Sequence, residues 1–457
     1  MKFKQYKIIN KRLKVITLQK AKKISVKIAL IIAVLIIIGS IGNYKKNQEI
    51  VLEFGIFSGN AYDVPNTNIN SYQIVDEAIE EFQKLHPGIK VKYSRVGILK
   101  NDYPEWLSGK IIEGKEPDVF VVQEGDFNTF ASIGIMKDLG PLISKDKDFD
   151  ISRMYENAVR SGQLDGIQYA LPREVEPTLM FVNKTLLEKE NIEMPKNDWT
   201  WNDFYEICKK VTKDTDGDGK IDQFGAVDFT WEDGVYTNGQ QLFTTDGKKA
   251  LFTQPEVLEA IQFVKKINDL NQNMKVTIDD FDKGNVAFRP FPFSWYRVYK
   301  SYPYRIIRYD DFEWECVKLP KGPNGNNASE LHSFLIGISS RSKHEKEAWE
   351  FLKFMVCHPQ SQRNVFKYSQ GVPVLREVTE SKDADEELRR YNPDEELAVD
   401  TRVLGEVIEH SIVTPRFHKY EKAMDMADKA IYQIINGGAE IEKTLKKLDD
   451  DLNEFLK

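Results

Sequence analysis

The chain has 457 residues, which is too long for one ordinary hydrophobic core, so we expect two lobes or domains. Its hydrophobic content of 41%, with 26 Phe, 19 Tyr and 7 Trp, excludes a disordered chain. Residues 1–42 contain ten Lys or Arg and no acid, and the remainder carries 54 basic against 71 acidic residues, a formal charge of −17. A body this acidic repels phosphate backbones, which excludes general nucleic-acid binding.

The basic leader runs into fifteen uncharged and mostly apolar residues, IALIIAVLIIIGSIG at 28–42. This length lies between that of a signal-peptide core and that of a full membrane span. Positive charge before the run predicts a cytoplasmic N-terminus and an extracytoplasmic body. We expect residues 1–45 to form a signal or anchor, and cleavage after Gly42 and retention both stay open. No cysteine follows the run before Cys208, so we do not expect a lipoprotein.

Beyond the leader, apolar runs typical of buried strands alternate with amphipathic helices. Strands are predicted at 49–57, 89–96, 117–122 and 334–339, and a strand that runs into a helix at 178–187. Helices are predicted at 71–86, 106–112, 199–212, 256–270 and 346–358, with two more after 420. Thr200 is a plausible N-cap, with Asp203 at the third helical position. This alternation predicts a parallel, layered α/β sheet.

Five segments, in this order along the chain, resemble the extracellular solute-binding proteins of ABC importers, in the family 1 branch that takes sugars and is similar to maltose-binding protein. They are DEAIEEFQKLHPGIKVKY, EPDVFVVQEGDFNTFASIGIMKDL, YALPREVEPTLMFVNKTLLEKENIEMPKNDWTWNDFYEICKKVT, GNVAFRPFPFSW and ISSRSKHEKEAWEFLKFMVCHPQSQRNVFKYSQGVPVLREV. The likeness covers about residues 48 to 455. No single motif is decisive, but five in the right order are specific.

The resemblance implies an α/β, two-lobed periplasmic-binding-protein-like fold, with hinge crossings and a ligand cleft between the lobes. The implied lobes are 48–172 with 322–358 and 175–318 with 359–457. The implied function is capture of a carbohydrate, such as an oligosaccharide, outside the cytoplasm for the permease subunits of an ABC importer. The resemblance implies a monomer that does no chemistry and requires no cofactor.

The segment KDTDGDGKIDQFG, 213–225, carries most of a calcium-loop pattern. Positions 1, 3, 5 and 9 of an EF-hand are occupied by Asp214, Asp216, Asp218 and Asp222. Position 12, which should be a bidentate Glu, is Gly225, and the next residues read as a strand rather than a second helix. The family has the same loop at this place. A structural Ca²⁺ and an ion-free turn both stay open, whereas calcium-driven switching is not expected.

A sugar offers a C–H face to aromatic rings and a rim of hydroxyls to charged and amide groups. By the resemblance, Trp295 is the stacking aromatic and Tyr296 is its neighbour, with a packed core tryptophan as the alternative. Pro290 and Pro292, which precede them, argue against a regular central strand there.

Asp228 and Trp231 are expected in a loop where the family often presents ligand contacts. A solvated loop without a ligand is the alternative reading. Two further candidates are weaker. Arg416 lies near the C-terminal helices, and His332 stands where the family usually has small residues, so it narrows the pocket or alters specificity.

Glu124 and Asp126 follow a buried strand at its C-terminal end, where open α/β sheets bind ligands. Asp126 is alternatively an N-cap. Arg173, Glu174 and Glu176 lie at the lobe crossing. Arg173 is a candidate to bind a hydroxyl pair, and Glu176 matches a ligand-facing acid of the family. A structural Arg–Glu pair that braces the hinge is equally compatible with the sequence.

Two other functions share some of these features. A secreted carbohydrate-active enzyme needs two carboxylates at a set separation, but the chain contains no GxSxG or HExxH signature. A ligand-sensing partner of a membrane receptor would share the fold and the cleft. An acidic or cationic small solute is a further alternative, in which the stacking tryptophan would be idle.

Overall fold

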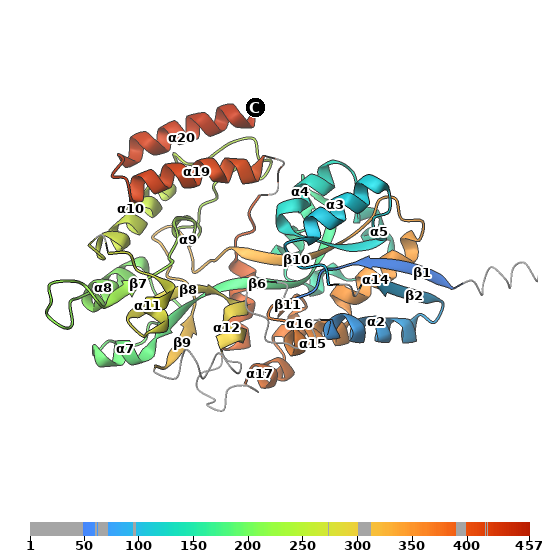
Figure 1. Ribbon diagram of the computed structural model, residues 1–457, viewed down its shortest axis with the longest axis horizontal. Coiled ribbons are helices and arrows are strands. Elements are labelled where there is room, and N and C mark those ends of the chain that lie inside the picture. Colours follow the sequence, from blue (N-terminus) through green and yellow to red (C-terminus); the bar gives the residue numbers. More distant parts are fainter. Residues whose placement is uncertain are drawn as a thin grey trace, which may run out of the picture. The chain divides into compact units, whose positions relative to one another are not determined.

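The structure is a computed structural model, and it describes residues 49–59, 62, 72–94, 97–272, 274–299, 312–389, 399–415, 417 and 419–457 (Figure 1). The predicted leader and anchor, 1–45, and the candidate Arg416 lie outside the described residues. Within the described segments, no helix is both long enough and apolar enough to cross a membrane.

Contacts divide the chain into two units. The described part of the first unit comprises 49–51 and 86–90, in which the Ile50 amide donates to the Gly88 carbonyl at 2.9 Å. The second unit, 52–85 and 91–457, holds the rest of the described chain. All residues of the site described below belong to this second unit.

The sheet is organised around one long strand, β6 (Ala170–Asn183), in which every residue except Thr178 is buried. The other strands of this sheet are β1 (Ile50–Gly55), β2 (Ile89–Tyr93), β3 (Val119–Val122), β7 (Phe224–Ala226), β8 (Val286–Pro292), β9 (Trp314–Val317), β10 (Leu331–Ile338) and β11 (Val372–Pro373). Their order is β2-β1-β3-β10-β6-β8-β7, with β9 and β11 also paired to β6. A separate hairpin joins β4 (Gln163–Leu164) to β5 (Ile167–Gln168).

The two halves of β6 pair with different strands. Its first half pairs with β10 and β11, and its second half with β8 and β9. The change falls between Pro177, which faces Leu331 of β10, and Thr178, which faces Pro292 of β8. One continuous strand therefore belongs to both parts of the sheet.

The prediction of a parallel sheet is wrong for the central strands. Parallel pairs join β1 to β3 and β7 to β8, but β10 is antiparallel to both β3 and β6, and β6 is antiparallel to β8. Apolar runs identify buried strands without showing their direction. Here β10 enters between β3 and β6 from a distant part of the chain, so its direction is not set by a neighbouring helix crossover.

The two prolines were predicted to argue against a regular strand at this place. This prediction is also wrong, because Pro290 and Pro292 both belong to β8. β7 pairs with β8 only as far as Phe288. The two prolines pair with β6 alone, and they alternate along the strand. Their missing N–H groups therefore fall on the side of β8 where β7 makes no pair, which is where a strand tolerates proline.

The helices fall into three groups along the chain. Before β6 they are α2 (Gln73–Leu85), α3 (Tyr103–Glu113), α4 (Glu124–Ser132), α5 (Gly140–Lys145) and α6 (Glu156–Arg160). Between β6 and β10 they are α7 (Lys184–Lys189), α8 (Trp201–Val211), α9 (Trp231–Thr237), α10 (Pro255–Asp269), α11 (Ile278–Asp282) and α12 (Phe293–Tyr299). After β10 they are α14 (Glu345–Cys357), α15 (Pro359–Tyr368), α16 (Arg376–Thr379), α17 (Lys382–Arg389), α18 (Thr401–His410), α19 (Tyr420–Ile435) and α20 (Ile441–Leu456).

The packing of the helices that follow β10 bears on the predicted lobe boundaries. α15 packs against α2 and α14, and α18 packs against α6, whereas α19 and α20 pack against α10. These contacts favour placing residues 359–410 with the first lobe rather than the second. The lobe boundaries themselves stay a prediction.

The predicted cap of α8 is confirmed. The Thr200 hydroxyl accepts the Asp203 amide at 3.3 Å, and the Asp203 carboxylate accepts the Thr200 amide at 2.9 Å, which is a reciprocal capping box. The cap starts a helix whose buried face includes Phe204 and Cys208, in one apolar cluster with Met180 of β6. The second half of β6 is thus packed against α8.

Replacing the cap by Thr200→Ala should lower the free energy of unfolding by about 1 kcal/mol, because the first turn of α8 loses a hydrogen-bond acceptor. Urea unfolding followed by circular dichroism measures this loss. Thr253→Ala is the matched control, since Thr253 is exposed and lies outside any helix or strand. Equal stability of the two variants would contradict the role of the cap.

Candidate functional site

A cavity of ≈ 440 Å³ lies at the strands that flank the partner change of β6. Small-ligand sites usually have volumes of this size. Its lining residues are Phe57, Tyr62, Lys100, Asn101, Val121, Val122, Gln123, Glu124, Gly125, Glu176, Pro292, Ser294, Trp295, His332, Ser333 and Phe334.

The fold brings these residues together from six separate segments of the chain, four of which supply the candidate ligand residues. Glu124 begins α4 close after the C-terminal end of β3. Glu176 of β6 and His332 of β10 are direct cross-strand partners, so their side chains leave the sheet on the same face. Trp295 lies in α12, which follows β8 without a break.

A hydrogen-bonded ion pair fixes one wall of the cavity. One oxygen of Glu124 accepts the Ser333 amide at 2.9 Å, and the other lies 2.9 Å from Nδ1 of His332. Burial alone would lower the pKa of His332, but the charge and hydrogen bond of Glu124 outweigh it and raise the pKa to about 10. His332 is therefore a cation at neutral pH.

Glu176 is the most unusual acid of the cavity. It is 6% exposed, and its Oε1 has no hydrogen-bond partner among the described residues. Burial raises the pKa of Glu176 to about 7, against the opposing effects of the His332 charge and of hydrogen bonds from Ser294. The Tyr62 and Ser333 hydroxyls are also buried without a partner in the described part of the chain. The cavity thus holds several buried polar groups that a polar ligand can satisfy.

Aromatic rings supply the apolar part of the lining. Trp295 is half-buried, and its ring lies 5.8 Å from that of Phe291 and 5.4 Å from that of Tyr299, measured between centroids. Phe334 packs against Phe57 at 5.8 Å. A supported indole beside unsatisfied polar groups suits a ligand that has both apolar and polar surfaces.

Four of the candidate residues line this cavity, namely Glu124, Glu176, Trp295 and the weaker candidate His332. Asp126 does not line it. Asp126 lies in the first turn of α4, where burial raises its pKa, and the N-cap of that helix is Gln123, so the alternative N-cap assignment is wrong.

Arg173 and Glu174 lie behind the cavity as a buried ion pair, with Nη2 and Oε1 3.1 Å apart. The same Glu174 oxygen accepts the Ser369 hydroxyl at 2.8 Å, and the Arg173 guanidinium lies 4.1 Å from the ring centre of Phe334. Arg173 therefore supports a lining residue without lining the cavity. This geometry favours the structural reading of the pair.

The expected loop around Trp231 is wrong, because Trp231 is the first residue of α9. Thr230 and Asp233 form a capping box there, a signal that was present in the sequence as TWED. Trp231 is 8% exposed, packs in an apolar cluster with residues of α10, α19 and α20, and donates its indole N–H to Asp428 at 3.0 Å. It lies in a core rather than at the cavity.

Asp228 and Tyr296 also lie elsewhere than the cavity lining. Asp228 has a positive φ of 59° and pairs with Nε of the buried Arg289 at 2.8 Å. Tyr296 is buried, and its hydroxyl accepts the Val399 amide at 3.1 Å. Sequence reasoning missed Tyr62, Ser294 and Ser333, because their place in the cavity depends on strand register and on contacts between distant segments.

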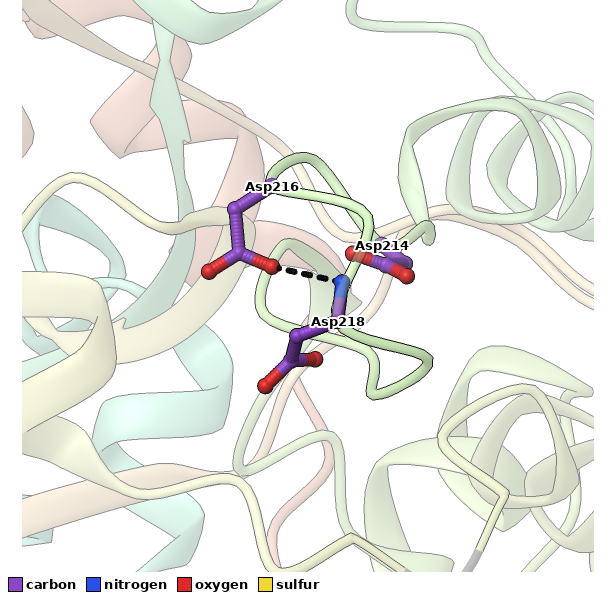
Figure 2. Close-up of side chains that lie close together, drawn as sticks. All are labelled: Asp214, Asp216 and Asp218. Atoms are coloured by element: carbon purple, nitrogen blue, oxygen red, sulfur yellow. Dashed lines mark hydrogen bonds between the residues drawn. The ribbon is translucent and has the colours of Figure 1, made fainter.

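The acidic loop brings three of its four predicted ligands together (Figure 2). Carboxylate oxygens of Asp214, Asp216 and Asp218 all lie within 4.8 Å of one another. The Asp218 amide donates to Asp216 at 3.0 Å, as Figure 2 shows. Asp222 is engaged differently, since it accepts the Thr215 amide at 2.8 Å and the Thr215 hydroxyl at 2.7 Å.

A second cavity, of ≈ 640 Å³, is larger. Its lining includes Gln163 of β4, Asp246 and Thr414, but none of the predicted ligand residues among those described. The smaller cavity is the better candidate, because it joins a supported tryptophan face to buried polar groups without partners.

Comparison with known proteins shows the family to which the chain belongs. A family model described as bacterial extracellular solute-binding protein matches residues 66–358. The galactooligosaccharide-binding protein of Bacillus subtilis is 22% identical over 397 residues, which cover 81% of this chain and 84% of that protein.

Two solved structures show the fold. An ABC substrate-binding protein from Listeria monocytogenes, in complex with cycloalternan, has a TM-score of 0.67 at 23% identity and covers 89% of this chain and 99% of its own. The cyclic α-maltosyl-1,6-maltose binding protein of Arthrobacter globiformis has a TM-score of 0.72 at 17% identity, with coverage of 89% and 98%. These likenesses confirm the predicted two-lobed α/β fold class.

The raised pKa of Glu176 makes stability depend on pH. The folded chain keeps a proton that the unfolded chain releases above pH about 4.5, so this stabilising contribution is full at lower pH and is lost as the pH rises through about 7. Glu176→Gln removes the effect. From pH 4.5 to 8 the variant should gain about 3 kcal/mol of unfolding free energy relative to the parent chain. Urea unfolding at both pH values measures the gain.

Glu188→Gln, on the exposed side of α7, serves as the control and should follow the parent chain at both pH values. A Glu176→Gln variant with the pH dependence of the parent would show that Glu176 is ionised normally in the folded chain.

Proposed function

We propose, on the premise that this chain belongs to the bacterial extracellular solute-binding protein family, that it captures a carbohydrate outside the cytoplasm and delivers it to the membrane subunits of an ABC importer. The observation that carries the proposal is the joint presence, in the lining of one cavity, of Trp295 and of a Glu176 oxygen that has no hydrogen-bond partner among the described residues. An indole binds the C–H face of a sugar, and buried carboxylate and hydroxyl groups bind its rim.

The ligand we propose is an oligosaccharide. The names of the related proteins above mention a galactooligosaccharide, cycloalternan and a cyclic maltosyl-maltose. Each of these ligands contains several sugar units. Their identity to this chain is low, so they support the class of ligand and not the particular sugar.

Closure on the ligand would bend the chain where β6 changes partners. Glu176 lies two residues before Thr178, the first residue that pairs with β8, and it is hydrogen-bonded by Ser294 at the start of α12. A ligand held by Glu176 and Trp295 would contact the first half of β6 and the helix α12 that follows β8. Its binding would therefore favour the closed form that the permease recognises.

We propose that the chain has no catalytic activity, in keeping with its family. Glycoside hydrolysis needs one carboxylic acid and one carboxylate placed on either side of a glycosidic bond. Of the two cavity acids, Glu124 uses both of its oxygens in bonds to Ser333 and His332. Glu124 is therefore poorly placed to act as an acid, a base or a nucleophile.

We further propose that the chain works as a monomer and that the apolar run at 28–42 places it outside the cytoplasm, either as a retained anchor or as a signal. No cysteine lies between this run and Cys208. Attachment to the membrane would then depend on the apolar residues 28–42 rather than on a covalently bound lipid.

A structural Ca²⁺ at the acidic loop belongs to the same proposal. The three clustered carboxylates supply the hard oxygen ligands that calcium prefers. Amides of Gly217 and Gly219 each donate to Asp214 at 2.7 Å, which shapes the loop before any ion binds. With Asp222 engaged by Thr215, the other ligands would be backbone oxygens or water.

Titration calorimetry of the full chain tests carbohydrate capture. The chain should be purified in a detergent without a sugar headgroup and titrated with maltotriose and with a galactooligosaccharide mixture. We expect saturable binding to at least one of them, and we expect Trp295→Ala to weaken it about tenfold or more. Tyr432→Ala, which removes a ring that is 62% exposed on α19, should leave the affinity unchanged.

No saturable heat with any sugar would overturn the carbohydrate assignment while leaving the fold intact. Unchanged affinity in the Trp295→Ala variant would overturn the stacking role alone.

Thermal unfolding with and without calcium tests the loop. An ion that binds only the folded chain raises its stability by about 2.7 kcal/mol at a hundredfold excess over Kd. The melting temperature should rise with calcium, fall back with a chelator, and not respond in an Asp214→Asn, Asp216→Asn double variant. A parent chain that melts at the same temperature with calcium and with chelator would establish the ion-free turn.

A further inference from the structure

His332 is held in one orientation at the cavity. Its Nδ1 is engaged by Glu124, which is itself fixed by the Ser333 amide. The side chain is 41% exposed and lines the cavity, and Nε2 has no hydrogen-bond partner among the described residues. With Nδ1 tied to a carboxylate, Nε2 is the polar atom that the ring can offer to a ligand. In the imidazolium form it is a donor only.

Glu176 offers the complementary group beside it. Glu176 and His332 face each other on adjacent antiparallel strands, and such side chains stand about 5 Å apart at their Cβ atoms. Ser294 hydrogen-bonds to Glu176, and Oε1 is the oxygen left without a partner in the described chain. The cavity therefore presents an acceptor and a donor next to each other.

The charges of the lining nearly cancel. The acidic and basic side chains that line the cavity are two carboxylic acids, Glu124 and Glu176, and two bases, His332 and Lys100, while the raised pKa of Tyr62 keeps its phenol neutral. Glu124 and His332 already neutralise each other as an ion pair. A ligand with its own charge would be buried without a counter-charge provided for it, which is costly. An uncharged ligand that has a hydrogen-bond donor next to an acceptor matches Glu176 and His332.

We propose that His332 and Glu176 together determine ligand specificity, by holding two adjacent hydroxyls of an uncharged sugar ring: one accepts from Nε2 of His332, and the other donates to Oε1 of Glu176. This inference rests on the proposed function, because it assumes that the cavity binds a carbohydrate. It adds the subclass of sugar, a neutral ring with an intact vicinal diol, and it assigns a selective role to His332.

The pair also gives binding a proton signature. The groups that face His332 are Glu124 from α4, Glu176 from β6 and Glu330 from the residue just before β10, and all three stabilise the imidazolium. Glu176 is faced by His332, Glu124 and Ser294. A hydroxyl that donates to the Glu176 carboxylate favours the ionised form. Binding near pH 7 should therefore release a proton, and affinity should rise between pH 6 and pH 8.

Calorimetry on the full chain tests the proposal. The neutral probes are maltotriose and the galactooligosaccharide mixture, and the charged probes are digalacturonic acid and the dimer of glucosamine. We expect binding of a neutral probe, with each charged probe at least tenfold weaker. Repeating the titration in phosphate and in Tris should show different apparent heats, because the two buffers take up the released proton with different enthalpies.

Substituted chains distinguish a role in ligand selectivity from an effect on folding. His332→Ala should weaken the neutral probe about tenfold. His332→Gln should recover part of the loss, because its amide still offers an N–H. Glu176→Gln should weaken binding and abolish the buffer dependence, whereas Glu188→Gln should change neither. Should a variant fail to fold, the buffer dependence of the parent chain still decides the role of Glu176.

The outcomes are distinct. No binding of any sugar would overturn the proposed function as a whole. Binding that is tighter for a charged probe, that is unaffected by His332→Ala, or that releases no proton at pH 7 would overturn the His332–Glu176 pair and leave carbohydrate capture standing.

Discussion

The sharing of β6 between two sets of partner strands is the constraint on which the rest of the structure depends. Thirteen of its residues are buried, so the strand cannot leave either part of the sheet without exposing apolar surface. Because the change of partner falls at Pro177 and Thr178, the side chains next to it lie where both parts of the sheet are within reach. Glu176 occupies this place, and the cavity forms around it.

The charged groups near this junction follow one rule, that burial requires pairing. Arg173 is paired with Glu174, and His332 with Glu124. Glu176 differs from them, since it forms no ion pair among the described residues and burial raises its pKa. The Arg173–Glu174 pair and Glu176 thus lie within one short stretch of β6. Their different environments, rather than their residue types, separate the supporting ion pair from the acid that we propose to bind the ligand.

Local features were predictable from the sequence, and register was not. The Thr200 cap, the position of Glu124 after β3 and the strand after the acidic loop follow from patterns of a few residues. The direction of β10, the pairing of His332 with Glu176 and the nearness of Tyr62 depend on contacts between distant segments, which periodicity does not encode. The helix at Trp231 is different, because its capping box was legible and the aromatic and acidic composition around it suggested a loop.

The topology also bears on the export that we propose for this chain. β6 needs β10 and β11 for its first half, and both lie far downstream, so the sheet cannot be completed until most of the polypeptide has been synthesised. Folds dominated by such distant pairings form slowly. A slowly folding polypeptide remains extended and threadable for longer, which is the state that a narrow translocation channel accepts. In a chain exported as we propose, the distant partners of β6 would therefore delay folding until after translocation.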